Sequence, residues 1–282
     1  MKLSEKFRQG NPSVSFEIFP PKGDLSIKEL SDILSKLCSL TPDFISVTYS
    51  AGGSGNSDKT STVASMVQNT YNTDAVAHLT CINSDMTEIE HMIAKFKSEG
   101  LENVLALRGD CTEDKKSDFS HASDLIPILK NNGFCVGATC YAEGHISCES
   151  PQKDWDILRI KQDAGVDFFI SQLFFDNEKF FEFWEYTKKI GINKPIIPGI
   201  MPILSQSQIT RMVFMCGASL PSSVIRLLNK YADNAEDLRK AGIEMATNQV
   251  LELLNHGVDG VHLYTMNHPD IAESQMNAIR SR

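Results

Sequence analysis

Residues 134–174, FCVGATCYAEGHISCESPQKDWDILRIKQDAGVDFFISQLF, contain one complete strand–helix–strand unit, and this unit decides the fold class. Its two ends, 134–141 and 167–174, are short and rich in apolar and aromatic residues, as is typical of buried strands. The segment between them reads as a helix that ends at Gly165, since glycine commonly terminates helices. Two buried strands joined by a helix indicate a parallel sheet covered by helices.

The same unit recurs on both sides of this stretch. Further candidate strands lie at 14–19, 44–49, 75–80, 103–108, 195–200 and 259–264. Most of them begin roughly 30 residues apart, the length of a strand with its crossover helix. Candidate helices with apolar residues at i, i+3 and i+4 lie at 26–39, 86–99 and 177–189. Eight such units favour a closed (β/α)8 TIM barrel, with an open doubly wound sheet as the alternative.

The interval before the last strand is about twice as long as the others. It reads as three helices, at 205–217, 221–230 and 234–255, so we expect an extra helical excursion before the last strand. No linker rich in Pro, Gly or Ser and no change of composition divides the chain. Residues 1–282 are therefore expected to form a single barrel domain.

Charge and cysteine content exclude several classes of protein. The 282 residues include 27 basic and 36 acidic ones, a net charge of −9, so neither nucleic acid nor a membrane surface is expected as a partner. The scattered cysteines form no CxxC pair, which favours reduced thiols; they are Cys38, Cys81, Cys111, Cys135, Cys140, Cys148 and Cys216. With no secretory signal and no apolar run of about 18 residues, a cytoplasmic location is expected.

The carboxyl ends of the candidate strands, where a barrel carries its functional side chains, are unusually polar. They hold Glu17, Thr48, Tyr49, His78, Thr80, Arg108, Asp110, Tyr141, Glu143, Gln172 and Tyr264. Burying polar side chains without partners costs free energy. Polar residues at nearly every strand end therefore predict a ligand lying across this face, which we call the barrel mouth.

Glu17 is the sharpest candidate at the mouth. It lies between Phe16 and Ile18–Phe19. Burial among aromatic side chains favours the neutral form of a carboxyl group, and a neutral carboxyl suits a general acid. Pairing of Glu17 with a basic neighbour such as Arg108 is the alternative.

Other candidates carry weaker signals. Gly109 allows a sharp turn, so the flanking Arg108 and Asp110 can both face the mouth. Lys161, in a predicted helix, can meet a diphosphate, although a solvated lysine on a helix face is the commoner outcome. His78 is by default a satisfied core histidine.

The sequence has one helix start suited to phosphate and no standard nucleotide or metal motif. Residues 121–124 (HASD) open a helix, where Ser123 or Asp124 can act as a cap and free backbone amides can bind phosphate. Residues 51–55 (AGGSG) do not match GxGxxG, and no P-loop pattern occurs, so a Rossmann site is not expected. No His, Cys or carboxylate pair has the spacing of metal ligands, and no metal is expected.

Eight segments together carry a family resemblance. In chain order they are SVSFEIFPPKG, DFISVTYSAGG, AHLTCI, NVLALRGD, HASDLI, KQDAGVDFFISQLFFD, PIIPGIMPI and GVHLYTMN. Each is modest alone, but their order and combination are specific. The chain resembles methylenetetrahydrofolate reductases of the bacterial type over about residues 13–270, without a counterpart of the regulatory domain of eukaryotic members.

The resemblance implies a cofactor, substrates and a reaction. It implies FAD bound without a Rossmann motif, NADH or NADPH as the donor, and a homo-oligomeric enzyme. The implied reaction is the ping-pong reduction of 5,10-methylenetetrahydrofolate to 5-methyltetrahydrofolate, which supplies methyl groups for methionine synthesis. Two alternatives stay open: a flavin-free one-carbon transferase barrel that binds a pterin or folate, and a non-catalytic barrel that binds flavin or folate.

The resemblance also implies residue roles. Glu17 is implied as the general acid that protonates the bridging nitrogen of the folate, Asp110 as a catalytic group near flavin and pterin, and Gln172 as a substrate ligand. The implied FAD-binding positions are Thr48, His78, Arg108, Gly109, Asp110, His121, Ala122, Tyr141, Asp154, Lys161 and Tyr264. Cys111 and Ala142 stand where proline is common in the family, which bears on loop shape near the flavin.

Overall fold

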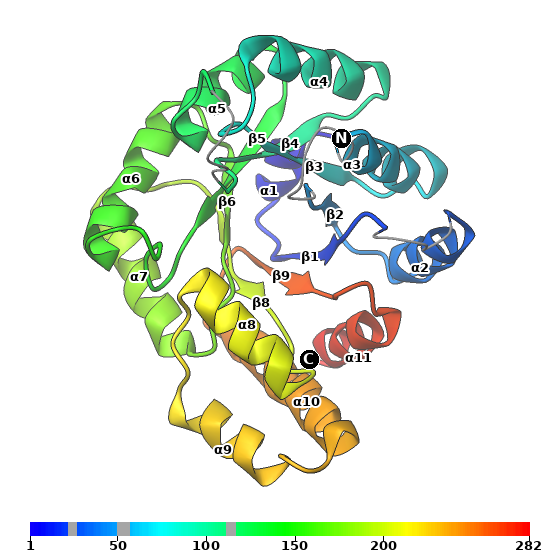
Figure 1. Cartoon of the computed structure of the whole chain (residues 1–282), viewed down its shortest axis with the longest axis vertical. Coiled ribbons are helices and arrows are strands. Elements are labelled where there is room, and N and C mark those ends of the chain that lie inside the picture. The colour runs from blue at the N-terminus through cyan, green and yellow to red at the C-terminus, as the bar shows by residue number, and fades with distance from the viewer. Residues whose placement is uncertain (22–26, 50–56, 111–116) are drawn as a thin grey trace.

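The computed structural model describes residues 1–21, 27–49, 57–110 and 117–282. A single parallel sheet forms its centre, in the strand order β7-β6-β5-β4-β3-β2-β1-β9-β8, and helices surround it (Figure 1). The strands are β1 (Ser13–Ile18), β2 (Phe44–Val47), β3 (Ala75–Thr80), β4 (Asn103–Leu107), β5 (Cys135–Cys140), β6 (Phe168–Ser171), β7 (Ile196–Ile197), β8 (Gly199–Ile200) and β9 (Gly260–Tyr264).

The two strands at the ends of this order belong to one short segment of chain. β7 pairs with β6, and β8 pairs with β9. Only Pro198 separates them, and its carbonyl accepts a hydrogen bond of 2.8 Å from the backbone N–H of His262. Because proline has no N–H to donate, the ladder changes partner at this residue. The sheet thus closes through residues 196–200, which confirms the (β/α)8 barrel over the open sheet.

Helices cover the outside of the barrel, and those expected at 26–39, 86–99 and 177–189 are confirmed. They are α2 (Ile27–Ser39), α3 (Ser57–Ser65) with the π-helix η1 (Met66–Thr70), α4 (Met86–Ser98), α5 (Ala122–Asn131), α6 (Pro151–Asp163), α7 (Asn177–Lys189), α10 (Ala235–Asn255) and α11 (Pro269–Arg280). One large apolar cluster holds their inner faces against the outward side chains of the strands.

The excursion before the last strand is present as expected. After β8 the chain forms α8 (Gln206–Cys216), α9 (Ser222–Lys230) and then α10, which lead to β9. α10 takes the regular outer position between α7 and α11, so α8 and α9 are the additional helices (Figure 1). They pack on a separate apolar cluster that includes Met201, Ile209, Val224 and Leu238.

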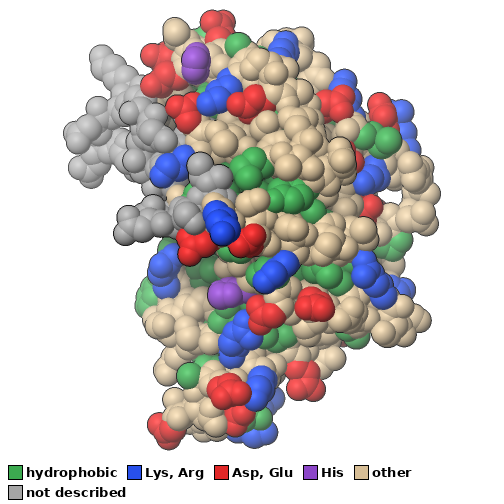
Figure 2. All heavy atoms as spheres, turned by 90° about the vertical axis from the view of Figure 1, so that its right-hand side faces the viewer, with side chains coloured by type: hydrophobic (Ala, Val, Ile, Leu, Met, Phe, Trp, Pro, Cys, Tyr) green, Lys and Arg blue, Asp and Glu red, His purple; other side chains and the backbone are tan. Residues whose placement is uncertain are grey.

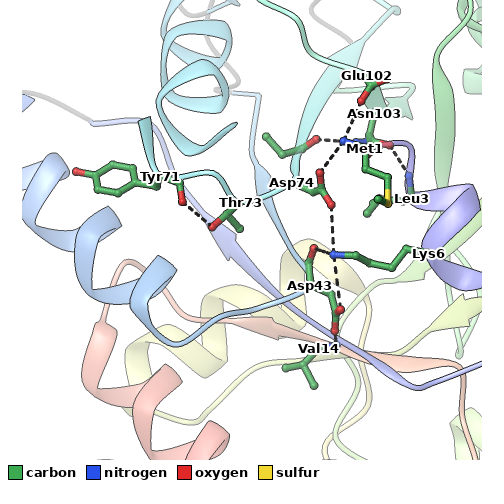
Figure 3. Close-up of polar contacts among 11 residues, drawn as sticks. Met1, Leu3, Lys6, Val14, Asp43, Tyr71, Thr73, Asp74, Glu102 and Asn103 are labelled. Atoms are coloured by element: carbon green, nitrogen blue, oxygen red, sulfur yellow. Dashed lines mark hydrogen bonds and ion pairs between the residues drawn. The ribbon is translucent and has the colours of Figure 1, made fainter. Parts of the chain in front are cut away.

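A short helix that the sequence did not predict, α1 (Leu3–Phe7), seals the amino end of the barrel. Leu3 is fully buried, and both Leu3 and Phe7 pack against lumen side chains of β2 to β7, such as Phe44 and Phe168. Polar contacts also hold α1 in place (Figure 3). Lys6 donates to the Asp43 carbonyl at 2.6 Å and pairs with Asp74 at 3.2 Å. The Asn103 side chain accepts from the Leu3 N–H at 2.8 Å.

The surface mixes both signs of charge. On the face drawn in Figure 2, Lys and Arg side chains are interspersed with Asp and Glu side chains. Within the described ranges, no helix is both long and apolar enough to cross a bilayer.

The buried end of α1 gives a test of this seal. Leu3→Ala removes a side chain from the closed lumen, where the remaining space cannot fill easily, so we expect the free energy of unfolding to fall by about 3 kcal/mol. Urea denaturation measures this change. Glu5→Ala, on the exposed face of the same helix, is the control and should change it little; equal losses in both variants would contradict the assigned role of Leu3.

Candidate active site

The position of Glu17 follows from strand alternation along β1. Successive side chains point to opposite faces, so Phe16 and Ile18 join the outer apolar cluster while Ser15 and Glu17 enter the lumen. The expectation that Glu17 lies among these aromatic neighbours is therefore wrong. Its own neighbours come from other strands, and its side chain is 12% exposed.

Two imidazoles face the Glu17 carboxyl group. Its Oε2 lies 3.8 Å from Nε2 of His78 on β3 and 3.6 Å from Nε2 of His262 on β9. Within the described residues, these two histidines are its ion-pair partners. The alternative partner, Arg108, does not pair with it; the Arg108 Nε instead donates to the Gly109 carbonyl at 3.3 Å.

His262 was not recognised in the sequence, although the signal was there. In GVHLY it lies two residues before Tyr264, and alternation puts both side chains on the lumen face. Its Nδ1 lies 2.8 Å from Ser15 Oγ, and its Nε2 lies 3.2 Å from Ser46 Oγ. The ring of Phe44 stacks against it, with centroids 6.0 Å apart, so the imidazole is held on several sides.

His78 is not the satisfied core histidine expected by default. It is buried, yet its Nε2 has no hydrogen-bond partner among the described residues. Burial lowers the pKa of His78 to about 4, a net value in which the Glu17 carboxylate opposes the shift and His262 adds to it. The ring is therefore neutral near pH 7, with one nitrogen left for a ligand.

Tyr264 and the chain around Gly199 close the same part of the mouth. The Tyr264 hydroxyl donates to the Ser171 carbonyl at 3.0 Å, and burial raises its pKa well above the usual value. A Cβ at Gly199 would lie 2.8 Å from this hydroxyl, so only glycine fits. Nearby, the Gln172 side-chain oxygen accepts from the Leu173 N–H at 2.8 Å, which leaves its NH2 group to meet a ligand.

A second polar cluster lies at the ends of β5 and α6. The rings of Tyr141 and His145 meet edge to face, with centroids 4.9 Å apart. Lys161 is half-buried, and its Nζ donates to the Thr139 carbonyl at 2.7 Å. Burial lowers the pKa of Lys161 and raises that of Asp154, while the attraction between the two opposes both shifts. The solvated lysine considered from the sequence is thus not what forms.

The His145 ring, also absent from the sequence-based candidates, ties this cluster to the β4 loop. Burial lowers its pKa, as does the charge of Arg108, whereas Asp154 and Asp110 oppose the shift. Arg108 and Asp110 follow β4, whereas His145 follows β5. The charges after β4 therefore act on the imidazole after β5. His145 lies five positions beyond the end of β5, farther than any of the strand-end candidates, so a search near strand ends does not reach it.

Gly109 shapes the β4 loop as expected. Its φ is +84°, and a Cβ there would lie 2.9 Å from the Thr80 Cβ. The turn presents Asp110 at the exposed rim, where its carbonyl accepts from Asn83 Nδ2 at 2.7 Å. Cys111 and residues 51–55, singled out in the sequence, lie outside the described ranges.

Of the two residues predicted as caps for α5, Ser123 and Asp124, it is Asp124 that caps the helix. The Asp124 carboxylate accepts from the backbone N–H groups of Ser120 and His121, both at 2.9 Å. His121 is exposed and Ala122 is buried at the first turn. Thr48, at the end of β2, uses its carbonyl to accept from Thr60 Oγ1 at 3.0 Å.

The described residues at this face offer neither a metal-binding cluster nor a reactive thiol. No group of three or more His, Cys, Asp or Glu side chains in the described part of the chain is placed to hold a metal ion. The six cysteines within the described ranges are free thiols. Burial raises the pKa of Cys81 and of Cys135 to about 12, so these thiols are not nucleophiles near pH 7.

The fold and this face define a class of protein: a (β/α)8 barrel with a buried carboxyl–imidazole group and a half-buried lysine at the carboxyl ends of its strands. The chain matches the methylenetetrahydrofolate reductase family model over residues 2–279. It belongs to that family.

Named relatives agree with the family assignment. The chain is 36% identical to methylenetetrahydrofolate reductase (NADH) 1 of Arabidopsis thaliana, with 95% of this chain and 49% of the plant protein covered. It is 32% identical to 5,10-methylenetetrahydrofolate reductase of Escherichia coli, with 94% and 89% covered. It thus spans about half the length of the plant and fission-yeast relatives and most of the bacterial one.

Solved structures share the fold at low sequence identity. An uncharacterized protein from Clostridium thermocellum, described as binding two copies of 5-methyl-5,6,7,8-tetrahydrofolic acid, superposes with a TM-score of 0.70 at 14% identity over 99% of both chains. Tryptophan synthase from M. tuberculosis gives 0.55 at 9% identity, over 98% of this chain and 96% of that one. Both likenesses concern the fold alone.

The neutral His78 predicts an acid-sensitive stability. The unfolded chain protonates this histidine near pH 6.5, but the folded protein does so only near pH 4. Its contribution is present above pH 6.5 and is lost as pH falls through this window, by up to about 3 kcal/mol. His78→Gln should therefore show a shallower fall of unfolding free energy between pH 6.5 and 4.

Denaturant titrations at several pH values measure this slope. His91→Gln, at an exposed position on α4, is the matched control and should keep the slope of the parent protein. A parent-like slope in His78→Gln would show that His78 is not the group responsible.

Proposed function

We propose that this protein reduces 5,10-methylenetetrahydrofolate to 5-methyltetrahydrofolate with a nicotinamide donor, using FAD bound at the barrel mouth. The observation that carries the proposal is the buried Glu17 carboxyl group beside two imidazoles at this face, in a chain of this family. The folate-bound neighbour of the same fold supports a pterin as the ligand. The plant relatives, which are named as NADH enzymes, support NADH as the donor.

The residues at the mouth fit FAD. Lys161 supplies a cation for the diphosphate in a chain that is acidic overall, and its neighbours Tyr141 and Asp154 offer polar and aromatic contacts. The unpartnered Nε2 of His78 supplies a further ligand contact. The Gly109 backbone approaches the Thr80 side chain so closely that a Cβ at Gly109 would not fit. FAD, when bound, supplies two-electron hydride chemistry that no side chain here can perform.

The remaining positions implied by the resemblance belong to the same proposal. Arg108 and Gly109 follow β4, His121 precedes α5 and Ala122 is its first residue, and the backbone amides and guanidinium of this segment are proposed to meet phosphate. Thr48 directly follows β2 and Tyr264 ends β9, and these two strands pair with β1 on either side of Glu17. Exposed Asp110 at the rim is proposed to orient the pterin, and the Gln172 NH2 group to donate to it.

Glu17 is the proposed general acid. Opening the imidazolidine ring of the substrate needs a proton on its bridging nitrogen, and Glu17 is the carboxyl group placed within the lumen at the mouth. Proton transfer leaves a carboxylate, which the adjacent His262 imidazole is positioned to stabilise. Donor and folate are proposed to react in separate half-reactions, with the product serving methionine synthesis and the protein acting as a homo-oligomer.

Reconstitution tests the cofactor and the reaction. We expect the purified protein to bind FAD, to lose its visible flavin absorbance when NADH is added without oxygen, and to regain it on adding 5,10-methylenetetrahydrofolate. Anaerobic absorbance spectroscopy measures each step. A protein that cannot take up FAD would contradict the proposal in favour of a flavin-free transferase, and one that binds FAD but is not reoxidised by the folate would indicate a binding protein only.

A matched pair of lysines on α6 sharpens the cofactor test. Lys161→Met removes the half-buried cation and should weaken FAD binding by about tenfold, the worth of one charge-assisted contact. Lys153→Met lies on the exposed side of α6, where Lys153 pairs with Glu149, and should leave FAD affinity unchanged. Equal affinities in the two variants would remove Lys161 from the site.

Glu17→Gln separates the two half-reactions. The amide keeps the size of the side chain but cannot donate the proton, so folate reduction should fall by about 100-fold or more while flavin reduction by NADH stays near the parent rate. Stopped-flow absorbance measures both in one variant, so the first half-reaction is the internal control. Equal loss in both half-reactions would mean that Glu17 has a structural role.

A further inference from the structure

We infer that Asn267 is a positioning residue for Glu17, because its side-chain amide holds the end of β1 in place where the main chain of the sheet no longer does so. The inference deepens the proposed function and rests on it for the role in catalysis. Two hydrogen bonds between Asn267 and the backbone of Phe19 carry it, and these bonds are a property of the protein alone.

The end of β1 has no main-chain ladder on the side of β9. The register of β1 with β9 ends at the pair of Glu17 and Tyr264. Phe19 is half-buried beyond that pair, and Pro20 and Pro21 come directly after it. Because proline has no backbone N–H, neither residue can donate to a neighbouring strand. Phe19 therefore carries the last backbone N–H before the proline pair, and that group needs a partner.

Asn267 satisfies both backbone groups of Phe19. Its Oδ1 accepts from the Phe19 N–H at 2.9 Å, and its Nδ2 donates to the Phe19 carbonyl at 3.0 Å. The orientation of the amide follows from its chemistry, since only the oxygen can accept from an N–H and only the NH2 group can donate to a carbonyl. One side chain thus supplies the two bonds that a neighbouring strand would otherwise make to this residue.

A turn after β9 brings Asn267 to this position. The His268 N–H donates to the Thr265 carbonyl at 2.9 Å, and the two residues between them, Met266 and Asn267, have φ of +53° and +60°. Positive φ at both central positions is typical of a type I′ turn and suits Gly, Asn and Asp. The turn is therefore strained at Met266, and the bonds from Asn267 to Phe19 help to hold it in this conformation.

Thr265 fixes the same strand end closer to Glu17. Thr265 is fully buried, and its Oγ1 donates to the Glu17 carbonyl at 2.8 Å. On the other side of β1, the Thr48 N–H donates to the Ile18 carbonyl at 3.0 Å. The backbone that carries the Glu17 side chain is thus held from both sides. Misplacing a reacting group by about 1 Å can cost about 100-fold in rate, so these bonds bear on the chemistry.

Hydrogen exchange of the full-length protein, without cofactor or substrate, tests the bonds to Phe19. Asn267→Gly removes the amide but keeps the residue that best tolerates positive φ, so it separates these bonds from the turn itself. We expect the Phe19 amide hydrogen to exchange about tenfold faster in this variant. Fragment mass spectrometry assigns the signal, and Pro20 and Pro21 contribute no amide hydrogen beside it.

Asn72→Gly is the matched control for the exchange experiment. Asn72 also has a positive φ, of +52°, but it is exposed and precedes β3 at the amino end of the barrel. This variant should leave the exchange of the Phe19 amide as it is in the parent protein. A Phe19 amide that exchanges at the parent rate in Asn267→Gly too would overturn the inference.

A double-variant cycle tests the role in catalysis. If Asn267 acts through Glu17, Asn267→Gly should slow folate reduction about tenfold in the parent protein but add little in Glu17→Gln, where the acid is already absent. FAD affinity and flavin reduction by NADH should stay near the parent values in Asn267→Gly, whereas a general loosening of the fold would lower both. Equal losses in the two backgrounds would overturn the positioning role.

A pair of variants at Thr265 checks the same strand end independently. Thr265→Ser keeps the hydroxyl that donates to the Glu17 carbonyl, whereas Thr265→Val replaces it by a methyl group of similar size. We expect folate reduction to fall about tenfold in Thr265→Val and to stay near the parent rate in Thr265→Ser. Equal rates in the two variants would remove Thr265 from the role. A parent protein that never reduces the folate defeats the proposed function instead, and the exchange result then still decides the bonds between Asn267 and Phe19.

Discussion

Closure of the barrel imposes the constraint on which the rest of this molecule depends: every second side chain of each strand must enter a lumen with little room. In β1 that rule sends Phe16 and Ile18 outward into the apolar layer and Ser15 and Glu17 inward. A carboxyl group enclosed this way needs polar partners from other strands. His78 and His262 supply them, so the electrostatics of the site is a product of closure.

Most of the fold was predictable because its signals are local. The parallel unit at 134–174 and the three helices before the last strand are marked by periodicity and by terminating glycines, which depend on neighbouring residues only. Helix α1 was missed for the opposite reason. Five residues show no period, and what stabilises them is the burial of Leu3 in a lumen built by strands far along the chain.

The site was predictable as a set of positions but not as a set of contacts. The strand-end rule found Glu17, His78, Tyr141 and Tyr264. It missed His262, which lies on β9 one inward-facing position before Tyr264. The aromatic surroundings expected for Glu17 came from adjacency in sequence, whereas alternation makes sequence neighbours the residues that a strand side chain does not touch. Distances across a lumen depend on how strands are staggered, and spacing along one strand does not encode stagger.

The closure of the amino end by α1 limits how a ligand can reach the lumen. Leu3 and Phe7 pack across the amino end, so among the described residues that end of the lumen is closed. Whatever reaches the Glu17 carboxyl group must enter and leave on the same side. Two ligands that both contact Glu17 could not pass through the barrel one behind the other. The first would have to leave before the second binds. The proposed alternation of donor and folate would then follow in part from the helix that closes the opposite end of the barrel.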